Sequence, residues 1–456
     1  MKHPNTPFLF FVISTFLSNL VFWNGKAYGI TDAYSNAKPT NIMKPSGTSE
    51  LADKNNPQQP NVVICGGGPG GLLTSVLLSN IGIQSTVIEQ STESTPWGIK
   101  SYTIVLNEKG KGSLDKGGCL EATLEAGQER QFTVLVNPET GDLQKIPNKP
   151  PNLAITRHDL VQSIEKIACG STNVTFKKGV GVSCVTEDGN SGLLVQLEDG
   201  SKIPATHVIG ADGKWSKVRE SFPSFSSTME TCPSSAVHLN TVGIPPGWDS
   251  NGTYLIRPMN KECKFYVIGS ALPGENGMSL TMVYFDQMLE KHPWLQPAQS
   301  ITPMNYIEGW NEAPNSGTGV DLASHLKTFF EKELPAVAAL LDDKVYRTAV
   351  VRRRATWLRM EESEGTPVNY SSNDGRVSLI GDAAHAMTAS IGEGCNTALD
   401  SAVKLVESVV ETMKEKDEKS CTAETMSLAF ARYGSSRPKE CIVIQEKSAS
   451  RSTLTK

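Results

Sequence analysis

The sequence has no excess of basic charge, no paired cysteines and no internal repeat. Its 43 Lys and Arg residues stand against 48 Asp and Glu residues, a formal net charge of −5, which argues against a nucleic-acid-binding protein. The nine cysteines are an odd number, and no CxxC pair or Cys/His ligand spacing occurs among them. We therefore predict neither a zinc or other metal site nor a disulfide framework.

The length and the composition are those of a folded protein with more than one structural unit. At 456 residues the chain is about three times as long as a typical single domain. Hydrophobic residues make up 38% and charged residues 20%, which are ordinary globular values. We expect two or more structural units and a sizeable buried core.

The first residues of the chain resemble a targeting leader. The apolar run Pro7–Trp23 follows Lys2 and His3, and Ala27–Gly29 supplies small residues that fit a cleavage site. We predict that residues 1–29 form a cleaved secretory or ER signal, with an uncleaved membrane anchor as the alternative.

A second segment without apolar periodicity follows this leader. Residues 30–59 are rich in Asn, Ser, Thr, Lys and Pro, which predicts a disordered linker or a second targeting segment. No arginine precedes Arg130, which argues against a mitochondrial presequence. The two-part leader resembles plastid-targeting leaders of algae with complex plastids. We therefore expect the secretory pathway, the ER or a plastid as the location, and membrane association if the apolar run is not cleaved.

The folded part begins at Asn61 with a strand, a glycine-rich turn, a helix and a second strand. The apolar run VVIC precedes the turn Gly66–Gly71, a helix is predicted over Leu72–Ile81, and STVIE at Ser85–Glu89 is the next strand. This order is a complete βαβ unit.

The turn has the pattern GxGxxG in the context that gives the pattern its meaning. Gly66 permits the tight turn, Gly68 lets the backbone approach a pyrophosphate, and Gly71 lets helix and strand pack closely. Glu89 follows Gly71 by 18 residues, where a carboxylate accepts hydrogen bonds from an adenosine ribose. An acid there disfavours the 2′-phosphate of NADP, so the unit suits FAD or NAD. A dehydrogenase and a flavoprotein are both compatible with this unit.

Two later segments distinguish these classes. Ala211–Arg219 (ADGKWSKVR) resembles the DG motif of flavin-dependent aromatic hydroxylases, and Gly381–His385 (GDAAH) resembles their GD motif, which Gly392–Asn396 continues. With the glycine turn, the motifs occur in that family's order and at similar spacing over roughly residues 60–412. The chain thus resembles the single-component FAD-dependent monooxygenases, and among them the kynurenine 3-monooxygenase-like proteins.

The resemblance implies an α/β fold. It consists of a Rossmann-like FAD-binding domain with the GxGxxG, DG and GD motifs, an interleaved mixed-sheet substrate domain and a C-terminal helix. We predict FAD-binding segments at 60–230 and 351–413, a substrate domain at 231–350 and a C-terminal helical tail at 414–456. Apolar spacing predicts helices over Leu322–Leu341 and from Asn396 to about Met413.

The resemblance also implies a set of cofactor-binding residues. Asp382 would bind the ribityl hydroxyls, and Gly392 and Gly394 would let the backbone pass close to the isoalloxazine ring. The helix that starts near Asn396 would point its positive end at this ring. Arg157 matches an arginine near FAD in relatives, with a surface arginine as the alternative. The predicted set is Gly66, Gly68, Gly71, Glu89, Arg157, Asp212, Asp382, Gly392, Gly394 and Asn396.

The resemblance implies flavin chemistry. In this family non-covalently bound FAD is reduced by NADPH or NADH, which binds transiently. The reduced flavin reacts with O2 to give a C4a-hydroperoxide, which hydroxylates an electron-rich, usually aromatic, small molecule. The protein supplies positioning, water exclusion and electrostatic support, so we name no catalytic residue. We expect His385 to belong to the motif's architecture and Cys395 to be a small buried side chain.

Some positions depart from the family pattern. Ala389 replaces a proline, and Glu393 replaces a glutamine. Arg130 lies in a run that lines the substrate cavity in relatives and is predicted to bind a substrate carboxylate, with exposure at a strand edge as the alternative. The tyrosine that kynurenine hydroxylases carry downstream is missing from Lys145–Pro151. A lipid or carotenoid epoxidase or reductase of the same fold, and a non-catalytic FAD-binding protein, remain alternatives.

Overall fold

A computed structural model gives the fold of most of the chain. It describes residues 59–92, 103–189, 192–260, 262–272, 277–296, 322–352, 354–362, 365 and 367–453. The predicted signal at 1–29 and nearly all of the predicted linker at 30–59 lie outside the described residues.

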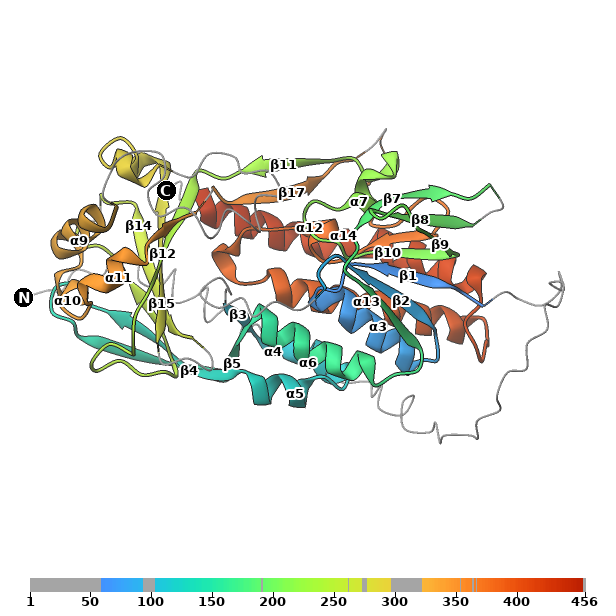
Figure 1. Ribbon diagram of the computed structural model, residues 1–456, viewed down its shortest axis with the longest axis horizontal. Coiled ribbons are helices and arrows are strands. Elements are labelled where there is room, and N and C mark those ends of the chain that lie inside the picture. Colours follow the sequence, from blue (N-terminus) through green and yellow to red (C-terminus); the bar gives the residue numbers. More distant parts are fainter. Residues whose placement is uncertain are drawn as a thin grey trace, which may run out of the picture. The chain divides into compact units, whose positions relative to one another are not determined.

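A five-stranded parallel sheet carries the three sequence motifs (Figure 1). Its strand order is β18-β10-β1-β2-β6. The strands span β1 Val62–Cys65, β2 Ser85–Glu89, β6 Val174–Lys178, β10 His207–Gly210 and β18 Val377–Leu379. Because the strands are parallel, the segments that follow β1, β10 and β18 leave the sheet at the same edge.

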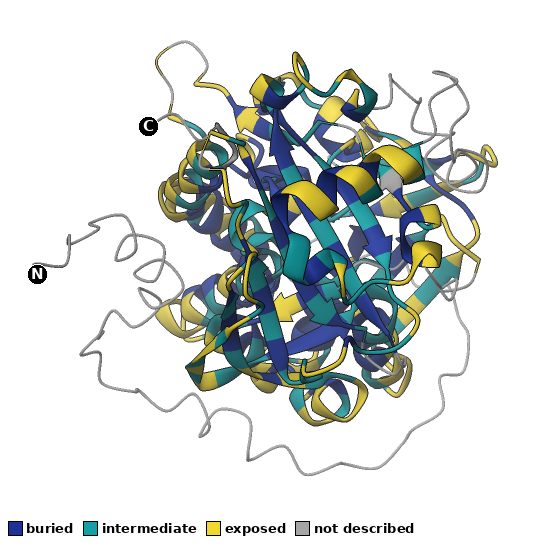
Figure 2. Ribbon diagram, turned by 90° about the vertical axis from the view of Figure 1, so that its left-hand side faces the viewer, coloured by how far each residue is buried: buried dark blue, intermediate teal, exposed yellow. Residues whose placement is uncertain are grey.

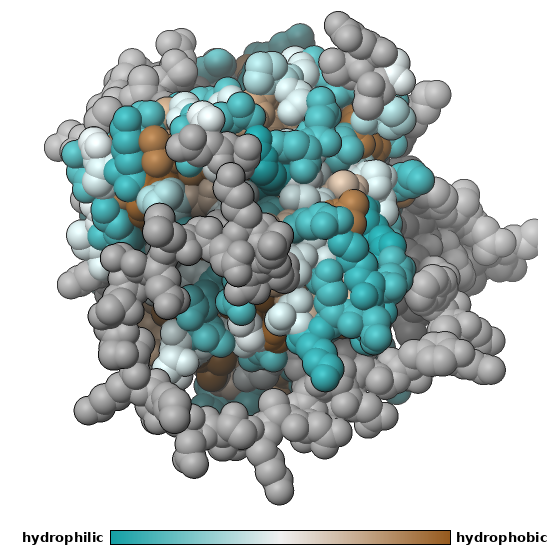
Figure 3. All heavy atoms as spheres, turned by 90° about the vertical axis from the view of Figure 1, so that its right-hand side faces the viewer, coloured by the Kyte–Doolittle hydropathy of each residue, from teal (hydrophilic) through white to brown (hydrophobic). Residues whose placement is uncertain are grey.

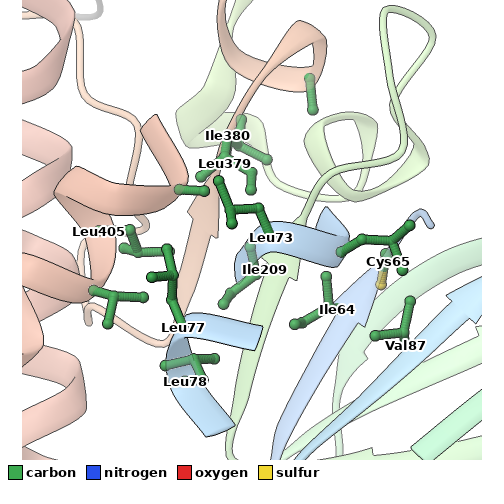
Figure 4. Packing of buried hydrophobic residues seen from close by; sticks show 14 of the residues in the cluster. Ile64, Cys65, Leu73, Leu77, Leu78, Val87, Ile209, Leu379, Ile380 and Leu405 are labelled. Carbon is green, nitrogen blue, oxygen red and sulfur yellow. The ribbon is translucent and has the colours of Figure 1, made fainter. Parts of the chain in front are cut away.

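Helices cover this sheet and form its core. These are α3 Pro69–Asn80, α4 Glu108–Lys116, α5 Leu120–Ala126, α6 Arg157–Cys169, α7 Lys217–Glu220, α12 Asp382–His385, α13 Gly394–Glu415 and α14 Ala423–Thr453. Figure 4 shows Leu73 and Leu77 of α3 among Ile64, Ile209 and Leu405, which come from β1, β10 and α13. These side chains are almost fully buried, so the segments that hold the motifs share one hydrophobic core.

An eight-stranded mixed sheet forms the second layer of the fold. Its order is β16-β12-β15-β14-β13-β4-β5-β3, and only β13 and β4 pair in parallel. The strands span β3 Thr103–Leu106, β4 Gln128–Val136, β5 Leu143–Thr156, β12 Ser234–Asn240, β13 Gly252–Ile256, β14 Phe265–Ala271, β15 Met278–Phe285 and β16 Val350–Val351. Strands β3 to β5 come from the predicted segment 60–230, which therefore contributes to both sheets.

One face of the eight-stranded sheet packs against helices α9 Leu322–Glu333, α10 Pro335–Ala338 and α11 Asp343–Arg347. Figure 1 shows these helices on the side of the sheet that faces away from the five-stranded sheet. Figure 2 looks onto this side and shows buried residues alternating with less buried ones along the strands. This alternation is expected for a sheet with one fully packed face.

The remaining elements are short. Strands β7 Val182–Glu187, β8 Leu193–Leu197 and β9 Lys202–Ala205 form a three-stranded sheet, and β11 Ser227–Thr231 pairs with β17 Thr356–Met360. Single 3-10 turns occur at η2 Pro223–Phe225, η3 Asp286–Met288, η4 Pro293–Leu295 and η5 Ala389–Ile391.

The predicted elements agree with the structure to different degrees. The strand Ser85–Glu89 is confirmed residue for residue, and the predicted helix from Asn396 is confirmed as α13. The single helix predicted over Leu322–Leu341 is wrong, because α9 ends at Glu333 and α10 begins at Pro335. Proline lacks an N–H group and is tolerated in the first turn of a helix, not in its interior.

Within the described residues, no helix has the length and apolar character needed to cross a membrane. Where the described residues are visible in Figure 3, hydrophobic residues lie in small groups between hydrophilic ones.

Three histidines are held neutral inside the fold. Burial lowers the pKa of His207 to about 4, of His238 to about 3 and of His385 to about 3. His207 packs edge-on against Phe430, and its Nε2 lies 2.9 Å from Oγ of Ser427. A histidine whose folded-state pKa is lowered binds fewer protons when folded than when unfolded, so it makes stability rise with pH in that window.

We predict that the melting temperature falls as the pH is lowered from 6.5 to about 4. Each of these histidines contributes a slope of up to about 1.4 kcal/mol per pH unit. His207→Gln keeps a hydrogen-bonding side chain but does not titrate, so it should flatten this dependence. The measurement is the melting temperature over this pH range.

A wild-type melting temperature that does not change between pH 6.5 and 4, or an unchanged slope in His207→Gln, would contradict the prediction.

Candidate cofactor-binding site

The glycine turn is forced by close backbone contacts. Gly66 has φ +112°, and a Cβ atom there would lie 2.3 Å from the carbonyl oxygen of Ala211. A Cβ atom at Gly71 would lie 2.1 Å from the carbonyl oxygen of Gly66. Only glycine fits at these two positions, so the turn holds β1, α3 and the segment after β10 in contact.

Gly68 differs from its neighbours because it faces open space. A Cβ atom there would have one protein neighbour within 4 Å, Nη2 of Arg157 at 3.7 Å. Gly68 is also the N-cap of α3, and no acidic residue occupies the first turn of this helix. The first N–H groups of a helix lack intrahelical partners and favour an anion. The fold itself therefore does not require glycine at position 68. A phosphate group bound close to the backbone would require glycine there.

Glu89 is tied to this turn. Its Oε2 accepts a hydrogen bond of 2.8 Å from the N–H of Gly67, and its Oε1 accepts one of 2.9 Å from the N–H of Ser91. The carboxylate thus lies beside the glycine turn, and each oxygen keeps a lone pair for a further donor. The predicted ribose contact of Glu89 stays a prediction.

Arg157 and Asp382 lie on the open side of the turn. Arg157 is the first residue of α6, whose N-cap Thr156 accepts a hydrogen bond of 3.0 Å from the N–H of Asp159. Asp382 begins α12 after Gly381, which has φ +57°. Surrounding protein raises the pKa of Asp382, and Lys214 and Arg157 oppose this shift. Asp382 is nevertheless exposed.

The start of α13 lies close to Arg157 and Asp382. Gly392 is left-handed at φ +67° and Gly394 is the first residue of the helix. Burial raises the pKa of the Cys395 thiol to about 12, and the charges of Asp382 and Arg157 act on it. Cys395 thus lies next to these two residues, and its raised pKa disfavours the thiolate form. Gly68, Arg157, Asp382 and the start of α13 are brought together although they are far apart in the sequence.

The side chain of Asn396 makes its hydrogen bonds within the protein. Its Nδ2 donates to the carbonyl oxygens of Val105 and Gly392, each at 3.0 Å, and its Oδ1 accepts from the N–H of Asn107 at 3.1 Å. The side chain is 1% exposed. Asn396 thus fastens β3 and α4 to α13, and its predicted cofactor contact stays a prediction.

Asp212 also has its oxygens engaged by the protein. It accepts hydrogen bonds from Oγ of Ser216 at 2.6 Å and from the N–H groups of Lys217 at 2.7 Å and Val218 at 3.1 Å. The carboxylate therefore fixes the start of α7, and direct cofactor contact through it stays a prediction.

Sequence reasoning missed Lys214 and did not foresee the contacts of Glu393. Lys214 donates to the carbonyl oxygen of Thr356 at 2.9 Å, and its charge acts on Asp382; its place in the DG segment could have revealed it. Glu393 accepts from Nδ2 of Asn107 at 2.9 Å and lies 3.2 Å from Nζ of Lys109. The unusual acid at 393 thus holds α4 against α13, a pairing that no local pattern indicates.

Arg130 lies apart from these residues, in the eight-stranded sheet. It is 1% exposed and donates to the carbonyl oxygens of Ser250 and Ala271. The alternative of an exposed strand edge is therefore wrong. Its Nε has no hydrogen-bond partner, and no carboxylate of the described chain pairs with it. Burial lowers the pKa of Arg130 to about 10.

Searching the described ranges for a metal site gives no group of three or more His, Cys, Asp or Glu side chains that could hold an ion.

Comparison with known proteins gives consistent matches over most of the chain. Residues 59–313 and 345–429 match the family described as "FAD binding domain". FAD-dependent monooxygenase phnB of Penicillium herquei is 23% identical over 76% of this chain and 81% of its own. Kynurenine 3-monooxygenase of Salinispora arenicola is 22% identical over 77% of this chain and 73% of its own.

A solved structure has the same fold. HpxO of Klebsiella pneumoniae, in complex with FAD and uric acid, superposes with a TM-score of 0.61 over 86% of this chain and 88% of its own. The two sequences are 18% identical, so this likeness bears on the fold alone.

We predict that Gly68→Val removes the cofactor and leaves the fold intact. The added side chain meets little protein but fills the space beside the start of α3. Gly71→Val is the matched contrast, because its Cβ atom would collide with the Gly66 carbonyl and should destabilise the apoprotein itself. The measurements are bound flavin per chain and the melting temperature of the apoprotein.

Asp382→Ala should also lose flavin, since it removes the exposed carboxylate of the site. Normal yellow colour in both Gly68→Val and Asp382→Ala would contradict the assignment of this site.

Proposed function

The chain belongs to the FAD binding domain family, and on this basis we propose that it is an FAD-dependent monooxygenase that hydroxylates an electron-rich small molecule. The observation that carries the proposal is the meeting of Gly68, Arg157 and Asp382 beside the starts of α3 and α13. These three residues come from segments that are far apart in the sequence. The similarity to FAD-dependent monooxygenase phnB and to kynurenine 3-monooxygenase supports the reaction class.

The residues present fit FAD. The N–H groups at the start of α3 suit the pyrophosphate, and Arg157 adds a positive charge beside Gly68. Asp382 is an exposed acceptor for ribityl hydroxyls. The start of α13 offers N–H groups and the positive end of a 22-residue helix to the ring. When bound, FAD supplies the redox chemistry and activates O2; the protein binds, orients and excludes water.

NADPH or NADH is proposed as the electron donor. The sequence has one glycine-rich nucleotide motif, which the FAD site uses, so the nicotinamide cofactor would bind transiently.

A small acidic aromatic compound is the proposed substrate. Its support is Arg130, a buried cation without a carboxylate partner in the described part of the chain. Burying an unpaired charge is costly, and a bound carboxylate would neutralise it through charge-assisted hydrogen bonds.

The location of the protein is a separate proposal. It rests on the sequence of residues 1–59 alone, which favours the secretory pathway, the ER or a plastid, with a membrane anchor as the alternative.

We predict that the purified protein oxidises NADPH or NADH faster when an aromatic acid is added, and that the product gains one oxygen atom from labelled O2. A panel of aromatic acids, kynurenine and carotenoids serves as the test. Stimulation by carotenoids alone would favour the epoxidase or reductase alternative. Bound FAD without any oxygen uptake would favour a non-catalytic protein.

We predict that Arg130→Ala raises the apparent KM for an acidic substrate about 10- to 150-fold, because it removes about 1.5–3 kcal/mol of charge-assisted hydrogen bonding. FAD affinity should not change. Arg130 also binds two backbone carbonyls, so the melting temperature is measured in parallel. A lower melting temperature with an unchanged KM would show that Arg130 only supports the sheet.

A further inference from the structure

A buried arginine in the C-terminal helix connects to the GD segment. Arg437 of α14 has a side chain that is 2% exposed, and its Nη2 lies 2.7 Å from Oδ2 of Asp400 in α13. Its Nε donates to Oγ of Ser401 at 3.0 Å, and its Nη2 donates to the carbonyl oxygen of Thr397 at 3.2 Å. Nη1 donates to Glu440 at 2.6 Å. Arg437 thus ties α14 to the first two turns of α13.

The contacts continue from Arg437 to His385. Oγ of Ser401 lies 2.8 Å from Nε2 of His385 and donates to the carbonyl oxygen of Thr397 at 2.9 Å. Because the Ser401 hydroxyl has one proton and Arg437 can only donate, every contact is satisfied when His385 donates from Nε2. Nδ1 of His385 is buried without a hydrogen-bond partner. His385 therefore links α12 to α13, in agreement with its predicted architectural role.

Helix α14 also contacts the loop at residues 386–390, which lies between α12 and α13. Nε2 of Gln445 donates to the carbonyl oxygens of Leu358 and Ala386, at 2.7 and 3.1 Å. Oγ of Ser448 donates to the carbonyl oxygen of Thr388 at 2.8 Å. Both side chains are buried. Residues 386–390, which connect Asp382 to Gly392 and Gly394, are thus fixed by α14.

We propose that α14 holds the cofactor site in shape and that Arg437 is its principal positioning residue. The proposal rests on the proposed FAD site, because Arg437 acts on α12 and α13 and does not itself touch a cofactor. Its charge is matched by Asp400 and Glu440. Removing the guanidinium leaves Asp400 and Ser401 without these bonds inside the protein, and α12 and α13 can then move apart.

The chain contains a matched control on the same helix. Arg432 also joins α14 to α13, at 2.5 Å from Glu415 and 3.8 Å from Glu411, but its side chain is 39% exposed and it pairs with the far end of α13. An exposed pair contributes little to stability.

The test compares Arg437→Met with Arg432→Met in the full chain. The FAD dissociation constant is measured by quenching of flavin fluorescence, together with the midpoint potential of the bound flavin. Arg437→Met should weaken FAD binding about 10- to 100-fold, because only part of the cost of leaving Asp400 without its buried partner falls on the cofactor site, and it should shift the midpoint potential. Arg432→Met should leave both close to the wild-type values. A potential shift is expected only if the surroundings of the flavin change.

Two further variants keep the proposal testable if Arg437→Met does not fold. Ser401→Ala breaks the link to His385 while Arg437 keeps its pair with Asp400, and Gln445→Ala frees the loop at 386–390; each should weaken FAD binding. Unchanged affinity and potential in Arg437→Met, Ser401→Ala and Gln445→Ala, or equal losses in Arg432→Met, would overturn the proposal.

These readouts do not need turnover. FAD binding by a wild-type chain that hydroxylates nothing would overturn the proposed function alone, and a wild-type chain that binds no FAD would overturn the site and the role of α14 together.

Discussion

The close approach of the glycine turn to the end of β10 is the contact on which the rest of the site depends. Gly66 lies so near Ala211 that no side chain fits between them. Strands β1 and β10 are parallel neighbours, with Cys65 opposite Gly210, and β18 continues the sheet beside β10. The first two motifs and the GD segment therefore leave the sheet at one edge, where the hollow between a parallel sheet and its helices receives ligands.

The second constraint is that α13 must be held at a fixed position beside this edge. Its first turn begins with Gly394 and Cys395, whose small side chains cannot fix the helix by packing. Asn396 and Glu393 bind it to β3 and α4 on one side, and Arg437 binds it to α14 on the other. The C-terminal helix α14 therefore supports the position of α13 beside the site.

The features that could be predicted from the sequence are those that depend on a local residue pattern. The strand β2 and the helix α13 follow from apolar spacing, and the sites at Gly66 and Gly71 follow from the steric demands of a tight turn. Contacts between distant segments did not follow. Asn107 and Asn396 are 289 residues apart, and the pairing of β3 to β5 with the second sheet has no local signal. The bonds of Asp212 to the start of α7 did not follow for the same reason, because they depend on how the segment after β10 folds.

We propose that this edge of the sheet binds one FAD without a covalent bond. The decisive measurement is to denature the purified protein and identify the flavin in the supernatant by chromatography. We expect one equivalent of FAD per chain, all of it released. The proposal is wrong if no flavin is found, if FMN is released in place of FAD, or if the flavin stays attached to the denatured chain.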